Sequence, residues 1–136
     1  MSAIARQSGS LLLWTGVVVF LTWPLAAHLT THLPGIAPLD SLLVGWALAH
    51  QSHALVTDPW SLPDGNIYWP ARRALFYGEA GFGAVPYFMP PFLATGNPTL
   101  ALNLVLLLGL VLTAWSMQRV VAHLTGSERE IGRAHV

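Results

Sequence analysis

Two long apolar stretches constrain the fold of this chain more than any other feature of its sequence. Residues Leu11 to Ala27 carry no charge, and residues Thr99 to Val121 carry a single one, Arg119. With their flanks, both approach the roughly 20 apolar residues that an α-helix needs to cross a bilayer. We therefore expect an all-α membrane protein with transmembrane helices over residues 11–27 and 99–121.

The composition of the chain supports this class. Of its 136 residues, 54% are hydrophobic and only 9% are charged, whereas soluble domains carry about 25% charged residues. The formal net charge is zero, and without a basic patch nucleic acid is not an expected partner. The absence of cysteine excludes disulfides and thiol chemistry.

The distribution of arginine predicts the orientation of the two helices. Arg6 precedes the first apolar stretch, no basic residue follows until Arg72, and Arg119 lies near the end of the second stretch. The positive-inside rule then places residues 1–10 and 122–129 in the cytoplasm and residues 28–98 outside. The alternative is a cleaved signal peptide, with Arg6 at its basic start and a cleavage site after Ala27.

The segment between the two apolar stretches has a different composition. Residues 28–98 contain nine of the ten prolines, four of the six acids, and most of the aromatic side chains. Pro and Gly divide it into short pieces, and aromatics suit a membrane–water interface. We expect a structured extracytoplasmic loop with juxtamembrane helices over 41–55, capped by Asp40, and over about 79–94. A third span over 79–94 is the alternative, and it would place Arg119 outside.

Four charged side chains of this loop are the candidates for chemistry. Asp40, at the membrane edge, can act as a general base on a hydroxyl or bind a metal; the plainer interpretation is a helix cap. Glu79 is a second candidate carboxylate, or else one member of an ion pair. Arg72 and Arg73 can hold a lipid-linked phosphate, because the planar arginine fork matches phosphate oxygens; pairing with nearby acids is the alternative.

Other polar residues favour structural roles. Asp58 and Asp64 precede Pro and Gly and are typical turn formers. Asn103 lies inside the second apolar stretch, where an amide is expected to bond a neighbouring helix. Two histidine pairs have spacings that could bind a metal on one helix face, but no cysteine or metalloprotease motif joins them, so no metal site is expected; these pairs are His28 with His32 and His50 with His53.

A series of short elements, spread from Leu11 to Ser127, resembles the N-terminal part of a group of bacterial multi-pass membrane proteins. These proteins are similar to the GT-C class of glycosyltransferases. The elements that carry the resemblance are Asp40 with Leu42-Leu43 and Trp46, His53-Ala54-Leu55 before Asp58-Pro59, Tyr68-Trp69-Pro70, Gly78-Glu79, Gly96-Asn97-Pro98 with Leu100-Ala101 and Asn103, and the exit from Arg119 to Leu124-Thr125-Gly126-Ser127.

The resemblance implies a bacterial inner-membrane enzyme that transfers a sugar from a polyprenyl-phosphate donor to an acceptor on the outer face. It implies membrane lipids and this donor as partners. In such enzymes an acid of the first outer loop lies in the active site, and Asp40 is the matching position. Many of them have two adjacent acids there, whereas this chain has Leu39-Asp40-Ser41. No cofactor is therefore expected, although the question of a divalent metal stays open.

The last seven residues, 130–136, read Glu-Ile-Gly-Arg-Ala-His-Val. They resemble the in-frame translation of a sequencing adapter, and we exclude them from the fold. On this interpretation residues 1–129 are the N-terminal fragment of a longer protein and are inactive alone. The alternatives are a small two-pass membrane protein that packs with a partner and is not an enzyme, and a fragment of a transporter.

Overall fold

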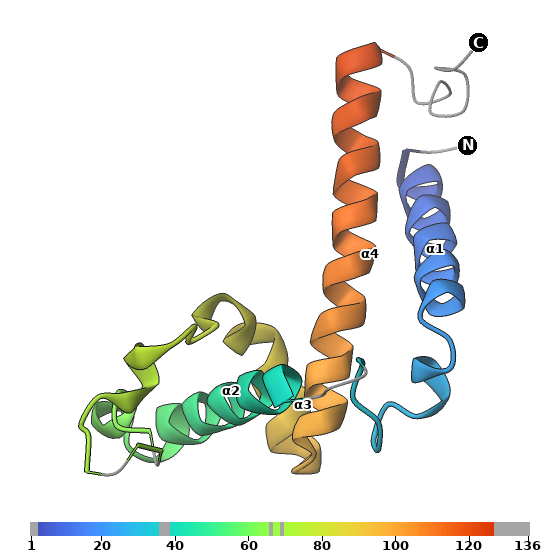
Figure 1. The fold of residues 1–136 in the computed structure, drawn as a ribbon. Helices are drawn as coiled ribbons and strands as arrows, with labels where there is room; N and C mark the ends of the chain where they lie inside the picture. Colours follow the sequence, from blue (N-terminus) through green and yellow to red (C-terminus); the bar gives the residue numbers. More distant parts are fainter. Residues whose placement is uncertain (1–2, 36–38, 66, 69, 127–136) are drawn as a thin grey trace. The chain divides into compact units, whose positions relative to one another are not determined.

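The structure is a computed structural model that describes residues 3–35, 39–65, 67–68 and 70–126 (Figure 1). The adapter-like residues 130–136, together with Trp69 of the resemblance and Ser127, lie outside the described residues. All regular secondary structure in the described part is helical. It divides into two compact units: Pro24–Val105 forms one, and α1 with α4 from Leu106 onward forms the other.

The first helix, α1, spans Ala3–Leu21, so the span expected over 11–27 ends six residues early. Pro24 explains the difference, because its ring has no N–H to donate and restricts the residue before it. The chain continues as a short 3₁₀ helix, η1, over Leu25–Ala27. The apolar part of α1, Gln7–Leu21, is about 22 Å long at 1.5 Å per residue, which is short of a 30 Å hydrocarbon core.

The loop helix expected over 41–55 is present and longer, as α2 over Leu39–Thr57. It ends where Asp58 takes an extended conformation before Pro59, as residues preceding proline do. Three short 3₁₀ helices follow α2 along the chain, namely η2 (Pro59–Ser61), η3 (Ala74–Tyr77) and η4 (Phe82–Ala84).

Helix α3 spans Val85–Thr95 and contains Pro90 and Pro91. Its 11 residues reach only about 17 Å, so α3 is about half the length of a membrane span. Gly96 then ends it with a left-handed φ of 67°, the usual role of glycine after a helix. The third span that the sequence left open over 79–94 therefore has no helix of sufficient length.

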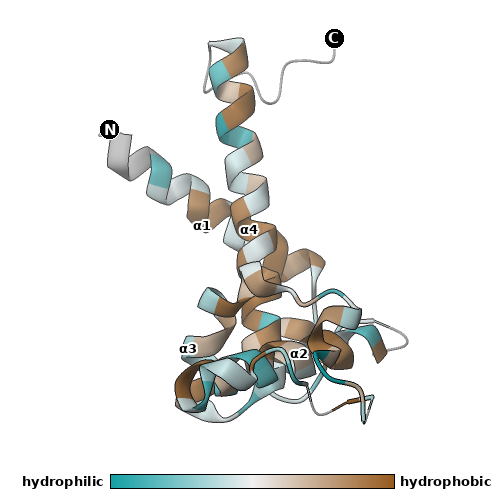
Figure 2. Cartoon of the chain, turned by 90° about the vertical axis from the view of Figure 1, so that its left-hand side faces the viewer, coloured by the Kyte–Doolittle hydropathy of each residue, from teal (hydrophilic) through white to brown (hydrophobic). Residues whose placement is uncertain are grey.

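Helix α4 spans Pro98–Thr125. Asn97 caps it, because its Oδ1 accepts a hydrogen bond from the backbone N–H of Leu100 at 2.9 Å, and Gly126 ends it with φ 67°. Helix α4 therefore exceeds the span expected over 99–121 by one residue at its start and by four at its end. It is the one helix among the described residues that is long and apolar enough to cross a membrane, and 11% of its most apolar window is buried. Figure 2 shows brown and pale residues along most of α4.

The core of the larger unit joins α2, α3 and the start of α4. Phe88 is fully buried, and around it lie Leu48, Val85 and Ala101. Phe88 also meets Phe92 with ring centroids 5.4 Å apart. This cluster holds α3 in place and explains how a segment with three prolines stays helical: burial of one aromatic side chain contributes about 2–3 kcal/mol.

Two asparagine amides fasten the segment after η1 to the start of α4. The Nδ2 of Asn103, which is fully buried, donates to the carbonyl oxygens of Leu29 and His32 at 2.8 Å each. The Nδ2 of Asn97 donates to the carbonyl oxygen of Thr30 at 3.1 Å. Asn103 thus bonds a turn of this chain, and not the neighbouring helix that its place in an apolar stretch suggested.

In the other unit, one glutamine joins two helices. The Oε1 of Gln118 in α4 accepts hydrogen bonds from the hydroxyl of Ser10, at 2.8 Å, and from the indole N–H of Trp14, at 2.6 Å. Ser10 and Trp14 lie four residues apart and therefore share one face of α1.

Candidate functional site

Asp40 lies in the first turn of α2 with its side chain exposed. It was predicted to cap the helix, but α2 already begins at Leu39, so Asp40 is instead an acid of the first turn. There its negative charge faces the positive end of the helix dipole. Because helical residues three and four apart share a face, Asp40 lies on the face of α2 that continues through Leu43 and Ala47.

A small hollow of about 60 Å³ opens on this same face of α2. Leu43 and Ala47 line it from the helix, and Glu79 lines it from the segment between η3 and η4. Leu43 is one helical turn from Asp40, about 4.5 Å along the axis. Glu79 thus lies against the part of α2 that carries Leu43 and Ala47, whereas Asp40 does not line this hollow.

The two arginines, Arg72 and Arg73, lie just before η3. Arg72 and Arg73 are exposed, and neither lines the hollow that contains Glu79. The backbone of Arg73 takes a left-handed φ of 58°, and its N–H donates to the Asp64 carboxylate at 2.7 Å. Asp64 thus has the structural role that its turn position predicted, and the arginine side chains face solvent, where a phosphate can reach them.

Asp58 also has a structural role. Its carboxylate accepts a hydrogen bond from the backbone N–H of Trp60 at 3.3 Å and so caps η2. Asp58 and Asp64 are therefore accounted for by backbone contacts, which leaves Asp40 and Glu79 as the carboxylates available for chemistry in the part of the loop that the structure describes.

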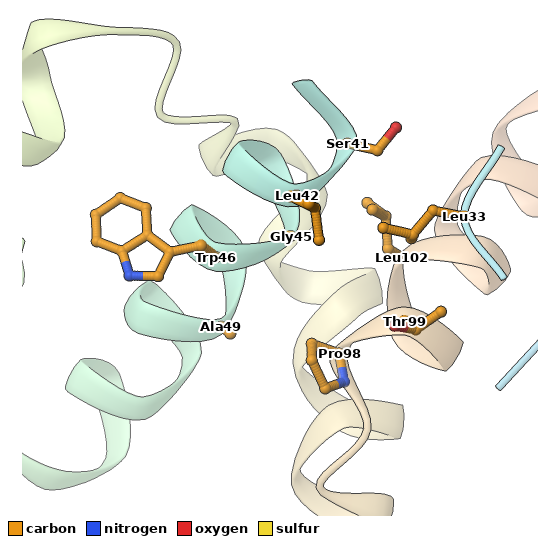
Figure 3. A pocket seen from close by; sticks show the side chains of 9 residues that line it. All are labelled: Leu33, Ser41, Leu42, Gly45, Trp46, Ala49, Pro98, Thr99 and Leu102. Atoms are coloured by element: carbon orange, nitrogen blue, oxygen red, sulfur yellow. The ribbon is translucent and has the colours of Figure 1, made fainter. Parts of the chain in front are cut away.

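A larger hollow of about 300 Å³ lies on the adjacent face of α2, against the start of α4. Figure 3 shows Leu42, Leu33 and Leu102 converging on it, while the indole of Trp46 points to the other side of the helix. Its lining is almost wholly apolar and suits hydrocarbon better than a charged group. The lining residues are Leu33, Ser41, Leu42, Gly45, Trp46, Ala49, Pro98, Thr99 and Leu102.

The histidines are used in different ways. His28 and His32 lie with ring centroids 4.5 Å apart, so this pair does share one side. His50 stacks on Trp46 at 5.7 Å, and its Nε2 lies 3.2 Å from the carbonyl oxygen of Leu62. Within the described ranges, no group of three or more histidine, cysteine or acidic residues is placed to hold a metal ion.

Three residues of this region were not predicted as site residues, although Tyr68 belongs to the Tyr68-Trp69-Pro70 element of the resemblance. Gln51 is fully buried, and its Nε2 donates to the carbonyl oxygens of Ala47 and Ala80, which anchors the segment next to Glu79 on α2. Tyr68 and Tyr77 line the Glu79 hollow. A signal for the tyrosines was available, because both flank the Arg72-Arg73 pair in a stretch rich in aromatic residues.

Comparison of the chain with protein-family models, with curated proteins and with solved structures found no match.

Proposed function

We propose that this chain is the N-terminal, membrane-embedded part of a glycosyltransferase similar to the GT-C class. In this proposal a sugar passes from a polyprenyl-phosphate donor to an acceptor hydroxyl at the outer face of a bacterial inner membrane. The reaction type is taken from the resemblance of the sequence elements to GT-C glycosyltransferases. The observation that supports it is an exposed acid, Asp40, in the first turn of α2, with Glu79 at a hollow on the same helix.

The proposed reaction uses Asp40 as the general base. Its carboxylate takes the proton from the acceptor hydroxyl, whose oxygen attacks the anomeric carbon of the sugar, and the bond from that carbon to the phosphate oxygen breaks. The polyprenyl phosphate leaves with the electron pair. Arg72 and Arg73, both exposed, are suited to bind the leaving phosphate, because arginine pairs with phosphate oxygens through two parallel hydrogen bonds.

The membrane context is supported by α4, whose length and apolar composition fit a span. With Asn97 at the outer end and Arg119 near the inner end, the positive-inside rule sets the loop outside and the N-terminus in the cytoplasm. In the proposed topology α1 also crosses the membrane, which gives two spans. Asn103, whose amide already bonds two carbonyl oxygens of this chain, is no support for the alternative of a small protein that packs with a partner.

The test is the Asp40→Asn variant of the protein expressed from its intact gene, assayed in membrane vesicles with a radiolabelled polyprenyl-phosphate hexose. General base catalysis contributes about 10²–10⁴-fold, so we expect glycolipid product to fall by at least about a hundredfold. Asp58→Asn is the matched control, because asparagine caps a helix as well as aspartate does. Equal product formation by both variants at equal expression would remove Asp40 from the mechanism.

A further inference from the structure

Two exposed tyrosines stand at the hollow that contains Glu79. Tyr68 and Tyr77 are 62% and 64% exposed, and their ring centroids lie 6.2 Å apart with the planes tilted by 36°. Both line the hollow together with Glu79. Aromatic rings of this size gain by burial, so a pair left open to solvent beside a carboxylate offers a stacking surface next to a hydrogen-bond acceptor.

The backbone at Tyr68 is strained. Its φ is 58°, a left-handed conformation that is unfavourable for a residue other than glycine. Backbone contacts around it hold the conformation: the N–H of Ala71 donates to the carbonyl oxygen of Tyr68 at 2.8 Å, and the N–H of Leu75 donates to that of Pro63 at 3.2 Å. Strain that is maintained by its surroundings is found mostly at binding and catalytic sites.

The chemistry of the hollow matches one ligand class. A hexopyranose ring has a face of C–H bonds, which carry partial positive charge and stack on the negative face of an aromatic ring. Its hydroxyls donate to carboxylates, and such charge-assisted bonds are the strong ones. Tyr68 and Tyr77 provide the stacking faces, and Glu79 provides the acceptor.

We infer that Tyr68, Tyr77 and Glu79 form a subsite for a hexopyranose ring against α2. The inference rests on the proposed function only where it names this sugar as the one transferred or as the acceptor. The stacking itself requires only the three side chains.

The experiment is saturation-transfer NMR on the full chain in lipid nanodiscs. The probes are the methyl glycosides of α-mannose, β-glucose and β-galactose, with glycerol as a polyol that has no ring. We expect transfer to the ring C–H protons of at least one glycoside and none to glycerol. Tyr77→Leu should weaken that binding about fivefold, since an aromatic contact contributes about 0.5–1.5 kcal/mol. Glu79→Gln should weaken it as well.

Phe76→Leu is the matched control, because Phe76 is an exposed aromatic residue of the same η3 helix that does not line the hollow. Equal loss in Tyr77→Leu and Phe76→Leu would overturn the subsite, and so would the absence of transfer to every glycoside. Unchanged glycoside binding in Tyr77→Leu would also overturn it.

Two further arms separate this inference from the proposed function. Asp40→Asn should keep glycoside binding while product formation is lost. Wild-type protein that binds a glycoside but forms no product from any polyprenyl-phosphate hexose would refute the transferase and leave the subsite standing. Comparison of a methyl glycoside with the polyprenyl-phosphate form of the same sugar distinguishes an acceptor position from a donor position.

Discussion

Gly65 lies against the indole of Trp46 in the turn that follows η2. A Cβ added at Gly65 would lie 2.8 Å from the Cη2 atom of Trp46, closer than real Cβ contacts. Trp46 cannot move freely, because it stacks on His50 with planes only 13° apart. Gly65→Ala should therefore destabilise the larger unit by about 1–3 kcal/mol, the usual cost of overpacking. Gly83→Ala, where a Cβ meets nothing within 4 Å, is the control, and circular dichroism on heating in detergent is the measurement. Equal midpoints for the two variants would contradict the contact.

Asn103 supports a second prediction for a single residue. Asn103→Leu keeps the volume but removes both donors to the carbonyl oxygens of Leu29 and His32. Both hydrogen bonds are partly buried, and a typical intramolecular hydrogen bond contributes about 0.5–1.5 kcal/mol. We expect faster amide hydrogen exchange over residues 28–33 and a lower unfolding midpoint.

The control for this variant is Thr113→Val, whose hydroxyl bonds only within its own helix, to the carbonyl oxygen of Gly109. Exchange over residues 28–33 that matches the wild type in both variants would show that Asn103 does not hold this segment.

Among the elements, α1 and α4 are joined by the polar contact at Gln118. A double-mutant cycle with Gln118→Leu and Trp14→Phe isolates the hydrogen bond between the indole N–H and the Oε1 atom, which is 2.6 Å long. Hydrogen bonds between membrane helices contribute about 0.6 kcal/mol on average, and we expect a coupling energy of that size in mixed micelles. Ser116→Ala in place of Gln118→Leu should give no coupling, because the Ser116 hydroxyl bonds within α4.

The elements differ in how well their sequence predicts them. The limits of α4 follow from Asn97-Pro98 and Gly126, and those of α2 were predicted to within two residues at each end. Helix α1 ends six residues before the predicted end at Ala27, because Pro24 interrupts the helix although the apolar composition continues. The helix expected over about 79–94 begins only at Val85, as α3. Pro90 and Pro91 oppose it locally, and packing around Phe88 supports it.

For the molecule as a whole, the residue types of the site could be predicted from the sequence, but their placement could not. Asp40 and Glu79 were singled out as carboxylates from local sequence, but the position of Glu79 against α2 depends on contacts between distant residues. Gln51, for example, bonds the carbonyl oxygen of Ala80, 29 residues along the chain, and no short pattern encodes that pairing. The stacking surface of Tyr68 and Tyr77 is equally non-local, because it requires the left-handed turn at Tyr68.

The proposed topology makes the last prediction, and the chain is well suited to its test because it contains no cysteine. Single cysteines can be placed at Ser8 before the apolar part of α1, at Thr57 at the end of α2, at Leu108 within α4, and at Thr125 at the end of α4. With a membrane-impermeant maleimide on intact spheroplasts, we expect labelling at Thr57→Cys alone. Ser8→Cys and Thr125→Cys should react only after permeabilisation, and Leu108→Cys should stay unreactive because apolar helix surface in hydrocarbon is shielded from water.

The critical position is Ser8. Among the described residues α4 alone is long and apolar enough to cross a membrane, and the apolar part of α1 reaches only about 22 Å. A short helix can still cross if the bilayer thins locally around it, and Arg6 favours a cytoplasmic N-terminus. If Ser8→Cys is labelled in intact spheroplasts together with Thr57→Cys, α1 does not cross, the chain has one span, and Asp40 reaches the outer face without a preceding transmembrane helix.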